Sequence, residues 1–125
     1  MDTRSHSVEV GPLRIVVVRR DDRENVGVVI QIQVAADAGH WAPALKFDAF
    51  GSQPHWHLYG PSRGGARVMA LSRSHPLENA MDLLHNLPCL LSAAGFLDEA
   101  KEVERRFDVE IIELVRRMVG RTRSV

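Results

Sequence analysis

The residues best able to do chemistry lie close together between positions 46 and 59. The segment His55-Trp56-His57 carries two imidazoles separated by one residue, and Asp48 precedes it by a few residues. Alternate residues of a β-strand point to the same face, so the two imidazoles would emerge together. Imidazoles and carboxylates bind divalent metals and also serve as general bases. The segment therefore indicates either a metal site or an acid–base site.

Two arrangements of these residues follow. In the first, His55, His57 and Asp48 bind a divalent metal as a two-histidine, one-carboxylate set. In the second, Asp48 orients His57 as the general base. Arg67 or Lys46 would then hold a phosphate, which suits the cleavage of phosphodiesters in RNA. A solvated polar surface without a site is the alternative to both.

Both arrangements need a β-hairpin. Leu45–Phe50 alternates apolar and polar residues, residues 51–54 read as a turn, and His55–Tyr59 reads as a short strand. We predict the register that places Asp48 directly across from His57, because it joins the apolar residues of both strands into one face. That core face would consist of Leu45, Phe47, Ala49, Trp56 and Leu58.

Further polar groups would line the opposite face of this hairpin. The predicted register places Lys46 opposite Tyr59. Pairing Val68 with Leu58 on the next strand would place Arg67 opposite Tyr59, on the same polar face. Arg63 lies in the glycine-rich loop 60–65, whose backbone amides could cradle an anion. We therefore name Lys46, Tyr59 and Arg63 as candidate substrate-binding residues.

The rest of the chain predicts a sheet followed by helices. Residues 13–18 and 26–34 read as an antiparallel hairpin. Helical spacing begins near Pro76, is interrupted at Pro88, and continues over Phe96–Gly120. We predict a single α+β domain over residues 1–125, frayed at about 1–9 and 122–125. Its antiparallel meander of four or five strands would carry two or three helices on one face.

The last predicted helix has a wide apolar stripe in its second half. One small sheet is not expected to cover all of it, and a symmetric dimer or a partner protein would bury the remainder. The residues predicted for this interface are Ile111, Ile112, Leu114, Val115, Met118 and Val119.

Composition narrows the class of protein. Sixteen basic residues balance sixteen acidic ones, so the net charge gives no general attraction to nucleic acid or to an anionic membrane. The single cysteine excludes an internal disulfide framework. The N-terminus lacks the apolar run of a secretory signal, so we expect a cytoplasmic protein without a membrane span. The arginine-rich, lysine-poor usage is typical of a GC-rich bacterial genome.

The segment Phe47–Gly51, followed by His55-Trp56-His57, resembles the TumE-type toxins of bacterial toxin–antitoxin pairs. Those proteins also carry an aromatic–aspartate segment before a histidine-rich strand, with a helix following. The resemblance covers only this hairpin and implies a toxin–antitoxin component. At the level of the whole chain, the sequence resembles an uncharacterised small bacterial domain.

Two functions follow from these observations. The first is a small intracellular protein-interaction or regulatory module, homodimeric and not an enzyme, which rests on the apolar width of the last helix. The second is a metal- or histidine-dependent, nuclease-like hydrolase that uses Asp48, His57 and Arg67, with a divalent metal as its cofactor. The sequence contains no complete catalytic signature that decides between them.

Overall fold

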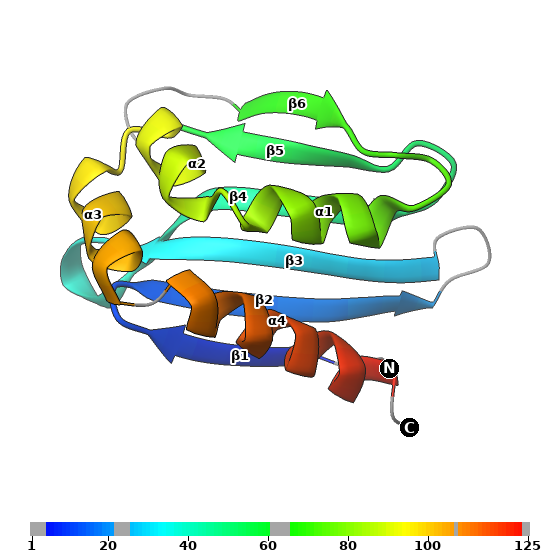
Figure 1. The fold of residues 1–125 in the computed structure, drawn as a ribbon, viewed down its shortest axis with the longest axis horizontal. Helices are drawn as coiled ribbons and strands as arrows, with labels where there is room; N and C mark the ends of the chain where they lie inside the picture. The colour runs from blue at the N-terminus through cyan, green and yellow to red at the C-terminus, as the bar shows by residue number, and fades with distance from the viewer. Residues whose placement is uncertain (1–4, 22–25, 61–65, 107, 124–125) are drawn as a thin grey trace.

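The computed structural model describes residues 5–21, 26–60, 66–106 and 108–123. Within these residues the chain forms one six-stranded sheet in which every strand pairs antiparallel with the next (Figure 1). The strands are β1 (Ser5–Val10), β2 (Leu13–Asp21), β3 (Val26–Ala35), β4 (Trp41–Phe50), β5 (His55–Tyr59) and β6 (Ala66–Ala70). A single 3₁₀ turn, Asp37–Gly39, separates β3 from β4. The predicted antiparallel meander is confirmed, with more strands than expected.

Four helices follow the sheet in the described part of the chain, and they lie on one side of it (Figure 1). They are α1 (Pro76–Leu84), α2 (Leu87–Ala93), α3 (Leu97–Arg106) and α4 (Asp108–Arg123). The α+β class is therefore confirmed, although two or three helices were predicted.

The additional strand comes from the N-terminal segment, where we predicted a frayed end. Residues 5–10 alternate in exposure and pair with β2 across the turn at Gly11. Val8 and Val10 pack against the hydrophobic core, because they lie on the helix-covered face of the sheet. Period-two alternation over six residues is sufficient to form an edge strand when a partner strand is available.

The long helix predicted over Phe96–Gly120 is two helices. The first, α3, packs on α2, whereas the second, α4, packs on β2 and β1, toward the β1 edge of the same face of the sheet (Figure 1). The chain has to change direction between these positions, and a single straight helix could not make both contacts. The junction, residue 107, lies outside the described residues.

The interface predicted on the last helix is wrong, because its side chains belong to the core of this single chain. Ile111, Val115 and Met118 are fully buried, and Ile112 and Val119 nearly so. Leu114 is partly buried against the same cluster. The sheet predicted from the sequence lacked β1, which is one of the strands that cover this helix.

The hydrophobic core lies between the helices and one face of the sheet. As predicted, Leu45, Phe47 and Ala49 of β4 are buried together with Trp56 and Leu58 of β5. The rings of Phe47 and Trp56 stack with centroids 5.6 Å apart. Since strand residues alternate between faces, Lys46 and Asp48 of β4 and His55, His57 and Tyr59 of β5 lie on the face away from the helices.

Candidate metal centre

The site lies on β4 and β5, whose register differs from the predicted one by two residues. Asp48 pairs with His55, and Lys46 pairs with His57. A shift of two residues is one full period of a strand, so it changes neighbours without moving any side chain to the other face. The chain therefore needs a wider turn between Asp48 and His55 than we predicted, and Gly51 adopts a left-handed conformation within it (φ 77°).

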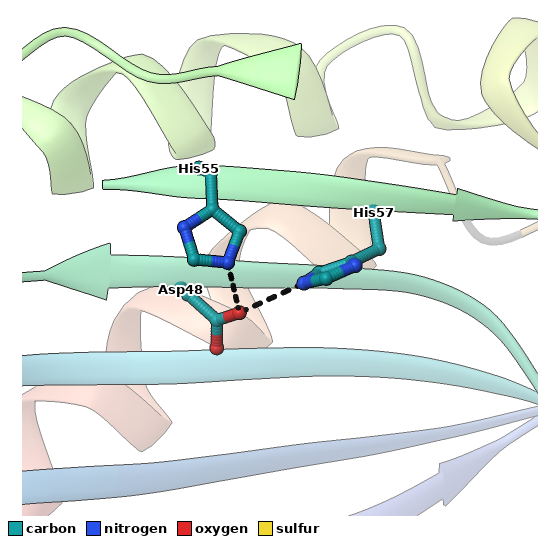
Figure 2. A group of neighbouring side chains, drawn as sticks. All are labelled: Asp48, His55 and His57. Atoms are coloured by element: carbon teal, nitrogen blue, oxygen red, sulfur yellow. Dashed lines mark hydrogen bonds and ion pairs between the residues drawn. The ribbon is translucent and has the colours of Figure 1, made fainter. Parts of the chain in front are cut away.

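The three predicted metal ligands converge on one point (Figure 2). Nε2 of His55 and Nε2 of His57 each lie 3.1 Å from the same oxygen, Oδ2 of Asp48. His55 reaches this oxygen from the directly opposite position and His57 from the diagonal one. One ligand atom from each residue lies within 4.8 Å of the others, so a single ion could contact all three.

The carboxylate of Asp48 is held in a nearly enclosed position. Asp48 is only 5% exposed, although its strand face is not covered by a helix. Val29, itself buried, lies across from it on β3. Nζ of Lys46 lies 3.9 Å from Oδ1, the oxygen that the histidines do not contact. A buried carboxylate is costly without partners, and here each of its oxygens faces a nitrogen.

The orientation of His55 is set by a backbone group. Its Nδ1 lies 3.0 Å from the carbonyl oxygen of Gln53. A carbonyl only accepts, so Nδ1 must carry the proton that makes this hydrogen bond. In a neutral imidazole the lone pair is then on Nε2, which faces the carboxylate oxygen of Asp48. Two acceptors at 3.1 Å repel each other unless a proton or a metal cation lies between them.

Aromatic contacts hold the second histidine. The rings of His57 and Tyr59 stack with centroids 5.9 Å apart and an interplanar angle of 17°. The rings of His55 and His57 meet edge to face at 4.9 Å. Burial, and after it the negative charge of Asp48, raises the pKa of the Tyr59 phenol above its ordinary value of 10.0. Tyr59 therefore supplies a neutral hydroxyl beside the cluster at physiological pH.

Arg67 does not belong to the site. It pairs with Leu58, whereas we predicted that Val68 would do so. This shift of one residue moves Arg67 to the helix-covered face and places Val68 opposite His57. The predicted role of Arg67 at the site is therefore wrong. Arg63 lies outside the described residues.

A pocket of about 370 Å³ lies beside His55, at the end of the edge strand β6. Sequence reasoning did not find it, because it forms between the β4–β5 turn and the segment after β6. Nor did it find the role of Gln53, because any residue type supplies a backbone carbonyl. The lining residues of the pocket are Gln53, Pro54, His55, Val68, Met69, Ala70, Leu71 and Arg73.

The fold and site define an α+β protein in which a helix-backed antiparallel sheet carries an Asp-His-His cluster on its other face. The chain belongs to the family described as a domain of unknown function, DUF7700, whose model matches residues 7–119. No curated protein and no solved structure gives a significant match to it. None of the helices in the described residues has the length and apolar character needed to span a bilayer.

Proposed function

We propose that this protein binds a divalent transition-metal ion through Nε2 of His55, Nε2 of His57 and Oδ2 of Asp48. The observation that carries the proposal is the contact between Nδ1 of His55 and the Gln53 carbonyl. Metal-ligating histidines usually donate their other ring N–H to a carbonyl or carboxylate, which directs the free lone pair at the metal. His55 has this arrangement, and its free lone pair faces a second ligand atom.

The spacing of the ligand atoms supports the same conclusion. Zinc lies about 2.0–2.2 Å from nitrogen and oxygen ligands, which places neighbouring ligands of a tetrahedral ion about 3.4 Å apart. The two Nε2–Oδ2 distances of 3.1 Å are close to that value. All three ligand atoms lie within 4.8 Å of one another.

The ligand types favour particular metals. Two imidazoles and one carboxylate suit Zn²⁺, Fe²⁺, Co²⁺ or Ni²⁺, whereas Ca²⁺ and Mg²⁺ prefer a shell of oxygens. Three protein ligands leave at least one position open, as in catalytic rather than structural zinc sites. An ion held in this way can activate a bound water or polarise a bound oxygen. Metal-dependent hydrolysis is thus the activity that this proposal favours.

The structure bears differently on the two other interpretations drawn from the sequence. The metal-free acid–base site loses Arg67, which lies on the opposite face of the sheet. It keeps Lys46 beside Asp48 and the contact between His57 and Asp48. The interaction module rested on apolar residues of α4, and those side chains are in the core.

The proposal is tested by titrating zinc into untagged, metal-stripped protein and measuring heat and bound metal. We expect one ion per chain. His57→Ala and Asp48→Asn should each weaken binding by about a hundredfold or more, since loss of an outer-shell partner alone costs about 10–100-fold. His75→Ala is the matched control, because His75 is exposed and its ring contacts Ser74. Equal losses in the control and the site variants, or no binding, would overturn the proposal.

A further inference from the structure

The pocket beside His55 opens next to the cluster that we propose to bind metal. Ala70 pairs with His55 across β5 and β6, so both side chains lie on the face that carries Asp48 and His57. The methyl group of Ala70 is small, which leaves space beside the imidazole. The volume of about 370 Å³ falls in the range of small-molecule sites. A ligand in this pocket would lie against a side chain that also holds the ion.

The lining of the pocket is apolar except at a few points. Pro54 and Leu71 are buried. The apolar side chain of Val68 is 58% exposed. Besides His55, the lining contains one ionisable residue, Arg73. Within the described part of the chain, no carboxylate lies within ion-pair distance of Arg73. The lining itself contains neither aspartate nor glutamate.

We propose that this pocket binds a small organic carboxylate. The carboxylate pairs with Arg73, since a guanidinium matches the planar geometry of a carboxylate with two parallel hydrogen bonds. The apolar body of the ligand covers Val68 and Leu71, and its far end lies beside His55. This inference rests on the proposed function in one respect: a donor atom at that far end takes the open position of the metal.

Charge and shape both favour this class of ligand. A neutral hydrocarbon would leave Arg73 without a partner, and a cation would be repelled by it. Phosphate alone is too small to use the apolar lining, and the pocket offers it one guanidinium. An anion with an apolar body of several carbons uses all of the lining groups.

The first experiment titrates hexanoate into the protein and follows backbone amide resonances. We expect the shifted resonances to lie along the pocket, and hexanol, a neutral molecule of similar length, to bind at least tenfold more weakly. Arg73→Gln should weaken the binding of hexanoate at least threefold. Arg117→Gln, at an exposed position of α4, should leave it unchanged. Ala70→Phe should fill the pocket and abolish binding, while Ala66→Phe, on the same face of β6 but outside the lining, should not. Equal binding of hexanol, or no effect of Arg73→Gln, would overturn the inference.

The second experiment separates this inference from the proposed metal site. Adipate carries a second carboxylate. Zinc should therefore raise the affinity of the protein for adipate at least tenfold, and its affinity for hexanoate far less. Equal affinity of adipate for metal-free and zinc-loaded protein would disconnect the pocket from the ion and overturn the inference. If zinc fails to bind while hexanoate still needs Arg73, the proposed function is wrong but the carboxylate pocket remains. If zinc binds and neither acid does, the pocket assignment alone is wrong.

Discussion

The carbonyl oxygen of Gln53 lies 3.0 Å from Nδ1 of His55, two residues further along the chain. This contact requires the proton on Nδ1, so Nε2 of a neutral His55 presents its lone pair to Asp48. The pair becomes attractive when a proton on Nε2 or a cation lies between the two atoms. The neighbouring contact between Oδ2 of Asp48 and Nε2 of His57 has the same length, 3.1 Å, and brings the third candidate ligand atom to the same place.

Zinc should stabilise the folded chain. The ligands come together only in the folded sheet, so the ion binds the native state preferentially. At a free zinc concentration of about 100 times Kd, the free energy of unfolding should rise by about 2.7 kcal/mol. Urea denaturation with and without zinc measures this, and EDTA should reverse it. His57→Ala should show no such rise; a rise of the same size in that variant would place the ion elsewhere.

Lys46→Met should strengthen metal binding. Nζ of Lys46 lies 3.9 Å from Oδ1 of Asp48, so its positive charge partly neutralises the carboxylate and repels an incoming cation. The side chain is 37% exposed, which keeps the effect small. We expect the zinc affinity to rise by about two- to fivefold at low salt and by less at high salt. Calorimetry at two salt concentrations checks this, and a weaker affinity in Lys46→Met would mean that Lys46 assists binding.

Two valines of α4 offer a matched test of where this helix is buried. Val115 is fully buried, whereas Val109 is 73% exposed. Val115→Ala should lower the free energy of unfolding by about 1.5–3 kcal/mol through lost burial and an unfilled cavity. Val109→Ala should change it by less than about 0.5 kcal/mol. Urea denaturation measures both values, and equal effects would contradict the packing of α4 on β1 and β2.

The single tyrosine reports on the site through its ionisation. Burial and the charge of Asp48 raise the pKa of Tyr59, so tyrosinate absorbance should appear at higher pH than in the unfolded chain. The native state then holds its proton where the unfolded state has lost it, and this group lowers stability as pH rises above 10.0. Asp48→Asn should lower the pKa of Tyr59 by removing the second of these causes. An unchanged titration in Asp48→Asn would show that the charge of Asp48 does not act on the phenol.

The sequence alone predicted which side chains share a face in the hairpin of β4 and β5. Asp48, His55 and His57 emerge together because alternation along each strand separates them from Phe47, Trp56 and Leu58. This holds for any register that differs by an even number of residues, so the two-residue error left the metal prediction intact. The prediction for Arg67 was off by one residue, and an odd shift moves a side chain to the opposite face.

Tertiary structure decided what local patterns do not encode. The apolar stripe of α4 was visible in the sequence, but whether a partner or the protein's own sheet covers it depended on β1. The lone pair of His55 depends on a backbone carbonyl, which has no residue-type signature. The pocket near Arg73 joins two segments separated by most of β5 and β6. Alternation and helical spacing are properties of neighbouring residues, whereas register, coverage and cavities arise only when distant segments pack together.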